Sequence, residues 1–131
     1  MRLILILSSV FFIFSCDYYH SWSAFGKALA SCEKYSDIKD GVSKDILGYS
    51  EGGSCMVSFQ VNSSQPLRCQ FNTRQNTEIA QFLMEFEHNE GSYAWRINHK
   101  KSPWEFTFER NLNEIENPIQ KAIEEGACKS S

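Results

Sequence analysis

The sequence predicts an α+β fold, an antiparallel sheet of about five strands with helices packed on one face and disulfides stapling it. Residues 55–72 and 93–109 carry apolar residues at every second position, which is typical of strands with one buried face. Three other stretches show three- and four-residue spacing, which is typical of amphipathic helices. The predicted order is helix, three strands, helix, two strands, helix (α-β-β-β-α-β-β-α) in one domain.

The first helix is expected over residues 20–36. Its apolar face would carry Trp22, Phe25, Leu29 and Cys32. The polar residues 37–45 are interpreted as a loop, and residues 46–50 as a short strand.

A hairpin is predicted next, with strands over 55–62 and 67–72 separated by a polar turn that contains Pro66. Its apolar face would carry Cys55, Val57, Phe59, Val61, Leu67, Cys69 and Phe71. Both cysteines therefore belong to the buried face of the hairpin.

The second helix is expected to be capped by Asn76 and to end near Gly91. Its apolar residues at helical spacing are Ile79, Phe82, Leu83 and Phe86. Strands over 93–98 and 104–109 follow, each with strict alternation. Asn117 and Pro118 then begin the last helix, because proline suits the first helical position.

The first residues differ from the rest of the chain. A single positive charge, Arg2, precedes an uncharged run over residues 3–14, which is too short to span a membrane but suits the core of a signal peptide. We therefore expect residues 1–15 to be a signal peptide and residues 16–131 to form a single exported domain.

The junction of these two parts contains Ile13, Ser15 and Cys16, and it resembles the signal of bacterial lipoproteins. Phe14 is larger than the residue usual in that family. The resemblance implies cleavage before Cys16 and a lipid (diacylglycerol, with acyl chains such as palmitate) on its thiol, which would hold the domain to a membrane facing the periplasm or the exterior. The alternative is ordinary cleavage after Ser15, which would leave a freely secreted protein.

Five cysteines are an odd number for an exported protein. A lipid on Cys16 leaves four, the number that two disulfides need, and export favours their oxidation. We expect Cys55–Cys69, since both would lie on one face of adjacent strands, and Cys32–Cys128. A dimer bridged through Cys16 is the alternative use of the odd cysteine.

Charge limits the partners of the exported domain. Without Arg2, one of 13 lysines and arginines, the domain has 12 basic against 16 acidic residues, a net charge of −4. Nucleic-acid binding calls for a basic face, so we expect no nucleic-acid partner. An acidic domain suits a basic protein partner, although modest negative charge also favours solubility.

One turn of this acidic domain is basic. The candidate binding residues there are Arg96, His99, Lys100, Lys101 and Trp104. Such a turn can hold a phosphate, a lipid headgroup or an acidic partner, since loops on a rigid scaffold often carry binding. The alternative is that the lysines serve solubility.

No catalytic, cofactor or metal motif is recognisable in the sequence. The acidic group Glu85, Glu87, His88 and Glu90 lacks a second histidine at zinc-binding spacing and is interpreted as a solvated helix end. We therefore expect a non-enzymatic protein-binding module: an inhibitor, an immunity-type protector or an accessory subunit of an envelope complex. The alternatives are a small exported hydrolase or ligand-binding domain, and a freely secreted factor.

Overall fold

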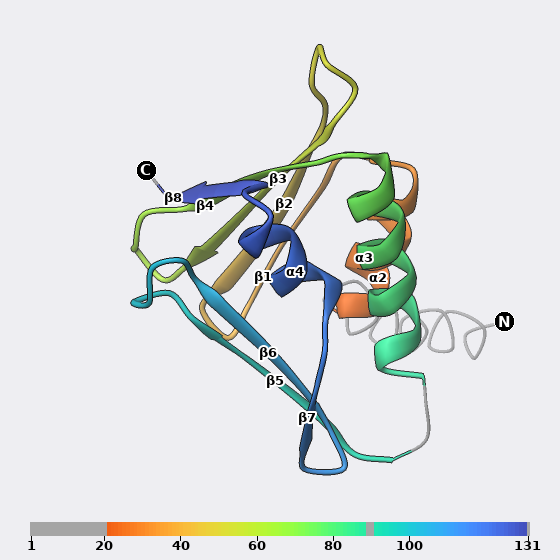
Figure 1. Cartoon of the computed structure of the whole chain (residues 1–131), viewed down its shortest axis with the longest axis vertical. Helices are drawn as coiled ribbons and strands as arrows, with labels where there is room; N and C mark the ends of the chain where they lie inside the picture. Colours follow the sequence, from red (N-terminus) through yellow and green to blue (C-terminus); the bar gives the residue numbers. More distant parts are fainter. Residues whose placement is uncertain (1–20, 89–90, 131) are drawn as a thin grey trace, which may run out of the picture.

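The computed structural model describes residues 21–88 and 91–130, which form an α+β fold with two antiparallel sheets (Figure 1). The helices of this part are α2 (Trp22–Ala30), α3 (Thr73–Phe86) and α4 (Pro118–Glu124). The strands are β1 (Tyr35–Lys39), β2 (Val42–Tyr49), β3 (Cys55–Val61), β4 (Leu67–Phe71), β5 (Tyr93–Asn98), β6 (Glu105–Arg110), β7 (Asn113–Ile115) and β8 (Cys128–Ser130). The fold class is as predicted. The expected signal peptide, 1–15, and Cys16 lie outside the described residues.

Each helix begins after a side chain that accepts a hydrogen bond from the backbone of its first turn. The three caps are Ser21, Asn72 and Asn117. The prediction that Asn76 caps α3 was wrong, since α3 begins one turn earlier. Asn76 is buried, and its side-chain N–H donates to the backbone oxygen of Leu29 at 2.7 Å, which ties α3 to α2.

The predicted loop over residues 37–45 is instead the β1–β2 hairpin, and α2 stops at Ala30 rather than near residue 36. Lys39 pairs with Val42, which leaves Asp40 and Gly41 as a two-residue turn with positive φ at both positions. Asp-Gly is a strong signal for this turn type. Polar residues on these strands had hidden the alternation.

The five-stranded sheet has the order β1-β2-β3-β4-β8 and buries one face. Along β3 and β4 the inward residues are buried and their neighbours are not, as the sequence alternation predicts. The inward residues of these two strands are Cys55, Val57, Phe59, Leu67, Cys69 and Phe71. This face therefore needs a cover, which the helices and the second sheet supply.

The second sheet has the order β5-β6-β7 and is separate from the first, whereas the alternating pattern predicts a single sheet of about five strands. Strands β7 and β8 were not predicted. Each has three residues, which is too short to show an alternating pattern.

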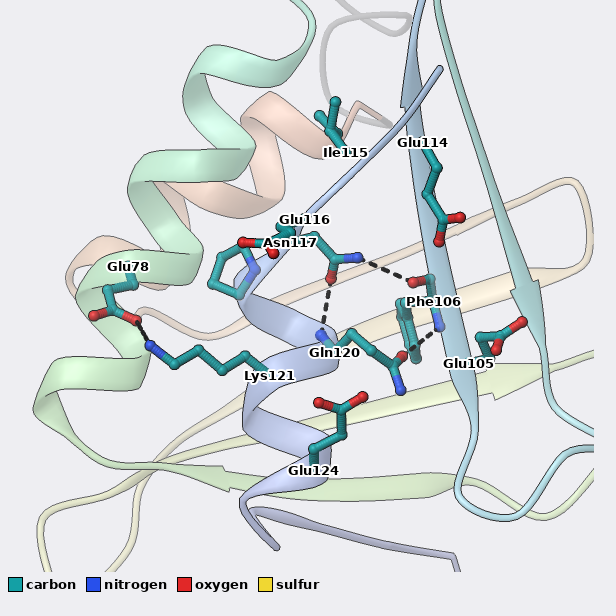
Figure 2. A pocket seen from close by; sticks show the side chains of 11 residues that line it. Glu78, Glu105, Phe106, Glu114, Ile115, Glu116, Asn117, Gln120, Lys121 and Glu124 are labelled. Carbon is teal, nitrogen blue, oxygen red and sulfur yellow. Dashed lines mark hydrogen bonds and ion pairs between the residues drawn. The ribbon is translucent and has the colours of Figure 1, made fainter. Parts of the chain in front are cut away.

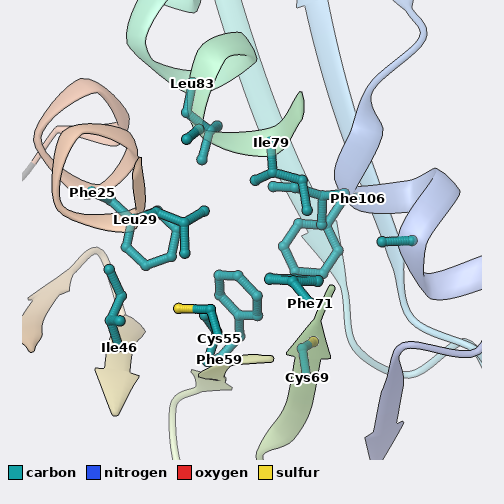
Figure 3. Packing of buried hydrophobic residues seen from close by; sticks show 14 of the residues in the cluster. Phe25, Leu29, Ile46, Cys55, Phe59, Cys69, Phe71, Ile79, Leu83 and Phe106 are labelled. Carbon is teal, nitrogen blue, oxygen red and sulfur yellow. The ribbon is translucent and has the colours of Figure 1, made fainter. Parts of the chain in front are cut away.

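One aromatic core joins the two sheets. The rings of Phe59 on β3 and Phe106 on β6 lie 5.1 Å apart, and Trp22 on α2 contacts both Phe59 and Phe108. Figure 3 shows Phe25, Leu29, Ile79, Leu83, Phe59 and Phe71 converging on the same space from helices and sheet. The second sheet is thereby fixed against the first.

Close packing of α2 on α3 depends on Gly26. A Cβ at this position would lie 2.8 Å from Cβ of Leu83 and 3.0 Å from the backbone oxygen of Ala80. Any larger residue would push the two helices apart, so the glycine serves their approach.

The two disulfides are Cys32–Cys55 and Cys69–Cys128, so the predicted pairs Cys55–Cys69 and Cys32–Cys128 were wrong. The hairpin register places Val57, not Cys55, opposite Cys69. Cys69 instead faces Cys128 of the unpredicted strand β8, and Cys55 bonds to the segment that follows α2. The first disulfide links helix to sheet, and the second holds the C-terminal strand to β4.

Two disulfides indicate an oxidising, extracytoplasmic location. Within residues 21–88 and 91–130, none of the helices has the length and apolar character needed to cross a membrane.

Candidate functional site

A groove of about 720 Å³ lies where α3 and α4 meet strands β6 and β7 (Figure 2). Its walls carry five glutamates: Glu78 from α3, Glu105 from β6, Glu114 from β7, Glu116 from the segment before α4, and Glu124 from α4. The single basic residue of its lining is Lys121. The lining is therefore strongly acidic, although the domain as a whole is only mildly so.

Apolar surface lies among these carboxylates. Ile115 and Pro118 are partly buried and Phe106 is almost fully buried, and all three line the groove. A cavity lined by apolar as well as acidic side chains suits a side chain with an apolar stem and a charged head, such as lysine or arginine.

The groove has a rigid frame, because α4 is hydrogen-bonded to the edge of β6. The backbone N–H of Phe106 donates to Oε1 of Gln120 at 2.7 Å, and its carbonyl accepts from Nδ2 of Asn117 at 3.0 Å. Strand β7 pairs only with Phe108–Arg110 and so does not reach Phe106. Side chains of α4 satisfy the backbone where the sheet ends (Figure 2).

Two of the five carboxylates have ionic partners. Glu78 lies 3.2 Å from Arg74 and 4.0 Å from Lys121. Glu105 accepts a hydrogen bond from Lys101 at 2.8 Å, which holds the pKa of Glu105 below its usual range. These two carboxylates are thus partly neutralised by the protein itself.

The other three carboxylates are exposed. Among the described residues, the ion pairs do not include Glu114, Glu116 or Glu124. Figure 2 shows Glu114 beside β6 and Glu124 on α4, on the side of the helix away from Glu78. This negative charge is available to a cation from outside.

The structure does not bring the predicted basic residues into one positive surface. Arg96 donates to Glu109 at 2.8 Å, Lys101 donates to Glu105, and both pairings raise the pKa of the basic partner. Trp104 is buried and belongs to the core. His99 lies against the edge of the Trp104 ring, and Lys100 is exposed. A binding role for this turn stays a prediction.

A second charged group is fully enclosed between α2 and the β1–β2 hairpin. Nζ of Lys44 lies 3.6 Å from Oδ1 of Asp37 and 4.3 Å from the centre of the Trp22 ring, and both charged side chains are at most 3% exposed. The Tyr35 hydroxyl donates a short hydrogen bond to Asp37. Burial lowers the pKa of Lys44, and the attraction of Asp37 acts in the opposite direction. Because the Lys44 and Asp37 side chains are buried, we interpret this pair as part of the structure of the fold.

The end of α3, interpreted as a solvated helix terminus, contacts the start of α2. Glu87 accepts a hydrogen bond from the backbone N–H of Ser23 at 2.8 Å, and Nε2 of His88 lies 3.1 Å from the Ser23 hydroxyl. A serine beside a histidine has the chemistry of a nucleophile and its base. Neither His88 nor His99 lines the acidic groove or the smaller hollow beside Tyr35, and a hydrolase at these residues stays an alternative prediction.

Sequence reasoning missed the acidic groove. Its carboxylates come from α3, β6, β7, the segment before α4, and α4, and no spacing along the chain marks them as neighbours. The one available signal was the density of glutamates after residue 104, which include Glu105, Glu114, Glu116 and Glu124.

Comparison of the chain with known protein families, with characterised proteins and with solved structures gave no match. The groove is therefore interpreted from its own geometry.

Proposed function

We propose that this protein is a lipid-anchored module of the cell envelope that binds another protein without catalysing a reaction, and that its acidic groove receives a cationic segment of that partner. The observation that carries the proposal is the groove itself, which has a volume of about 720 Å³, some apolar lining residues and three carboxylates outside any described ion pair.

Charge complementarity supports a basic partner. Carboxylates gathered in a cleft attract cations and speed their encounter with the protein. The apolar lining residues add contacts for the methylene stems of lysine or arginine, which bare surface charge does not offer. The frame formed by Asn117 and Gln120 presents the groove in one conformation, which lowers the ordering cost of binding.

The anchor part of the proposal rests on Cys16 and on the lipoprotein-like junction. Intact mass of the protein from its own cells, measured with and without reduction, tests it directly. We expect a chain starting at Cys16 with a diacylglyceryl or triacyl mass, in the membrane fraction, that gains four protons on reduction. An unmodified chain in the medium would overturn the anchor and favour the freely secreted alternative.

Photo-crosslinking tests the groove while the partner is still unidentified. A photoreactive amino acid replaces Lys121 in the groove or, as a control, Arg68, which is exposed on β4 of the other sheet. The full chain is expressed in its own cells and irradiated. We expect a protein adduct from position 121 whose cross-linked peptide is rich in lysine or arginine, and no such adduct from position 68.

Two charge variants make the test specific. The groove-neutral variant carries Glu114→Gln, Glu116→Gln and Glu124→Gln. The matched control variant carries Glu33→Gln, Glu51→Gln and Glu85→Gln, which are exposed glutamates outside the groove. Loss of the adduct in the first variant and its retention in the second supports the proposal. An adduct insensitive to both variants, an acidic cross-linked peptide, or no adduct would overturn it.

A further inference from the structure

The turn between β6 and β7 presents a leucine in an unfavourable backbone conformation. Arg110 pairs with Asn113, so Asn111 and Leu112 form a two-residue hairpin turn, and their φ angles are +49° and +67°. Glycine is the residue usual at the second position of such a turn, because a side chain there crowds the backbone. Leucine is therefore a poor choice for the backbone alone.

The leucine side chain is also unfavourable here, because it is left in solvent. Leu112 is 91% exposed and is the most exposed of the large apolar residues in the described part of the chain. A single exposed leucine is ordinary. A leucine that is exposed and also has a left-handed backbone conformation is unusual. Residues held in such strained conformations are often found at functional sites.

The turn is held in place rather than loose. The N–H of Asn111 donates to the carbonyl of Ser92 at 2.9 Å, and the N–H of Ser92 donates to Oδ1 of Asn111 at 3.1 Å. Gly91 makes room for this contact, since a Cβ there would lie 2.3 Å from the same oxygen. The β6–β7 turn, which carries Leu112, is thereby fixed, and it lies at the end of the three-stranded sheet away from the larger sheet (Figure 1).

The position of Leu112 indicates what covers it. Glu114 on β7 lines the acidic groove and follows Leu112 by two residues, so the Cα atoms of the two residues lie at most about 7 Å apart. A bilayer with anionic lipids would be repelled by Glu114 and Glu116, whereas a basic protein would be attracted. Charge complementarity thus favours a protein over a membrane.

We propose that Leu112 is an apolar anchor that inserts into a hydrophobic pocket of the same basic partner that fills the acidic groove. This inference rests on the proposed function and adds a second contact to it. Central apolar anchors surrounded by polar contacts commonly dominate the energetics of protein interfaces. A rigid turn suits this role, because little conformational freedom is lost on binding.

The test uses the basic protein captured from position 121, with its Kd measured against the full chain and four variants. Leu112→Gly and Leu112→Asn remove the apolar side chain while tolerating the turn. We expect each to weaken binding at least about tenfold, and Leu112→Met to stay within about threefold of wild type. Leu47→Ala, at another exposed leucine, is expected to leave Kd unchanged.

Measurement of stability distinguishes a binding anchor from a structural residue. Leu112→Gly relieves the backbone strain, so we expect it to raise Tm while it weakens binding. If Leu112 served the structure instead, the same substitution would lower both Tm and binding affinity. Unchanged Kd in Leu112→Gly and Leu112→Asn would overturn the anchor, and the groove would stand if its neutral variant still failed to bind.

If no partner is captured from position 121, the proposed function fails. A photoreactive residue at position 112 then tests Leu112 separately. A protein adduct from position 112 with an apolar cross-linked peptide would then support an anchor independent of the groove. Adducts with lipid alone would assign the leucine to a bilayer, and no adduct would leave it without a partner. Either of these two results overturns the inference.

Discussion

The enclosed pair Asp37–Lys44 and the acidic groove use the same charged groups in opposite ways. In the first, one carboxylate and one ammonium are removed from water beside each other: the Tyr35 hydroxyl donates to the carboxylate, the Trp22 ring lies against the ammonium, and Oδ1 of Asp37 has the ion pair but no hydrogen bond among the described residues. In the groove, carboxylates outnumber the one lysine of the lining and face solvent. Removal of either partner of the buried pair lowers stability strongly. The exposed carboxylates of the groove have only a small effect on stability.

This difference separates charges that hold the fold from charges that await a partner. A buried charge needs its counterion within the chain, because desolvation is expensive. A hydrated carboxylate needs no counterion within the chain. A group of such carboxylates beside apolar side chains is therefore explained better by a partner than by the fold. Substitutions in the two regions should therefore have very different effects on stability and on binding.

The largest effect is expected at Lys44. Lys44→Met leaves the Asp37 carboxylate buried without its counterion, and we expect the free energy of unfolding to fall by about 3–5 kcal/mol. Urea denaturation followed by circular dichroism measures the loss. Adding Asp37→Asn removes the uncompensated charge and should restore much of the stability. A loss below about 1 kcal/mol in the single variant would mean that the pair does not hold the fold.

Gln120 lies where the two kinds of region meet, because it satisfies the backbone of β6 and also lines the groove. Gln120→Ala leaves the N–H of Phe106 without an acceptor and should cost about 1–3 kcal/mol. Gln120→Glu keeps an acceptor and serves as the matched control. Hydrogen exchange at the Phe106 amide should speed up in the alanine variant alone, and equal exchange in both would contradict the bracing role.

Tyr35 offers a pH test of the enclosed group. Burial and the hydrogen bond to Asp37 raise the pKa of Tyr35 above its usual 10.0, so the folded state keeps the phenol proton that the unfolded state loses. This contribution is complete below pH 10 and declines as pH rises further.

Tyr35→Phe should therefore lower stability by up to about 1 kcal/mol at neutral pH, allowing for partial exposure, with a gap that narrows above about pH 10. Denaturation midpoints of both proteins at several pH values measure the gap. Lys44 titrates in both and cancels in the difference. A gap that is constant or widens with pH would contradict the assigned cause.

The fold could be predicted wherever a long element has a regular pattern. The alternation over 55–61 and the helical spacing of α3 gave strands and helix correctly, and Asn117-Pro118 marked the start of α4. The prediction failed for the β1–β2 hairpin, whose inward positions include the charged Asp37 and Lys44. Because the two charges meet only in the folded structure, the sequence of these strands resembles a polar loop.

The disulfides and the groove failed to emerge from the sequence for a related reason. The pairing depends on hairpin register and on β8, a strand of three residues with no readable period. The groove depends on α4 docking against the end of β6 through Asn117, which the sequence identifies only as a cap, and Gln120, which no sequence pattern marks. Local patterns predict elements, whereas tertiary contacts decide which residues become neighbours.

The smallest effect on stability is expected from the groove-neutral variant, and it bears most directly on the comparison. Removing three exposed like charges relieves repulsion, so the free energy of unfolding should stay within about 0.5 kcal/mol of wild type. Any increase should be seen at low ionic strength and vanish near 1 M salt, where charges are screened within about 3 Å. The matched control variant removes the same charge elsewhere and isolates the effect of clustering. A loss above about 1 kcal/mol would show that these carboxylates hold the fold, as Asp37 does, and would remove the reason to assign them to a partner.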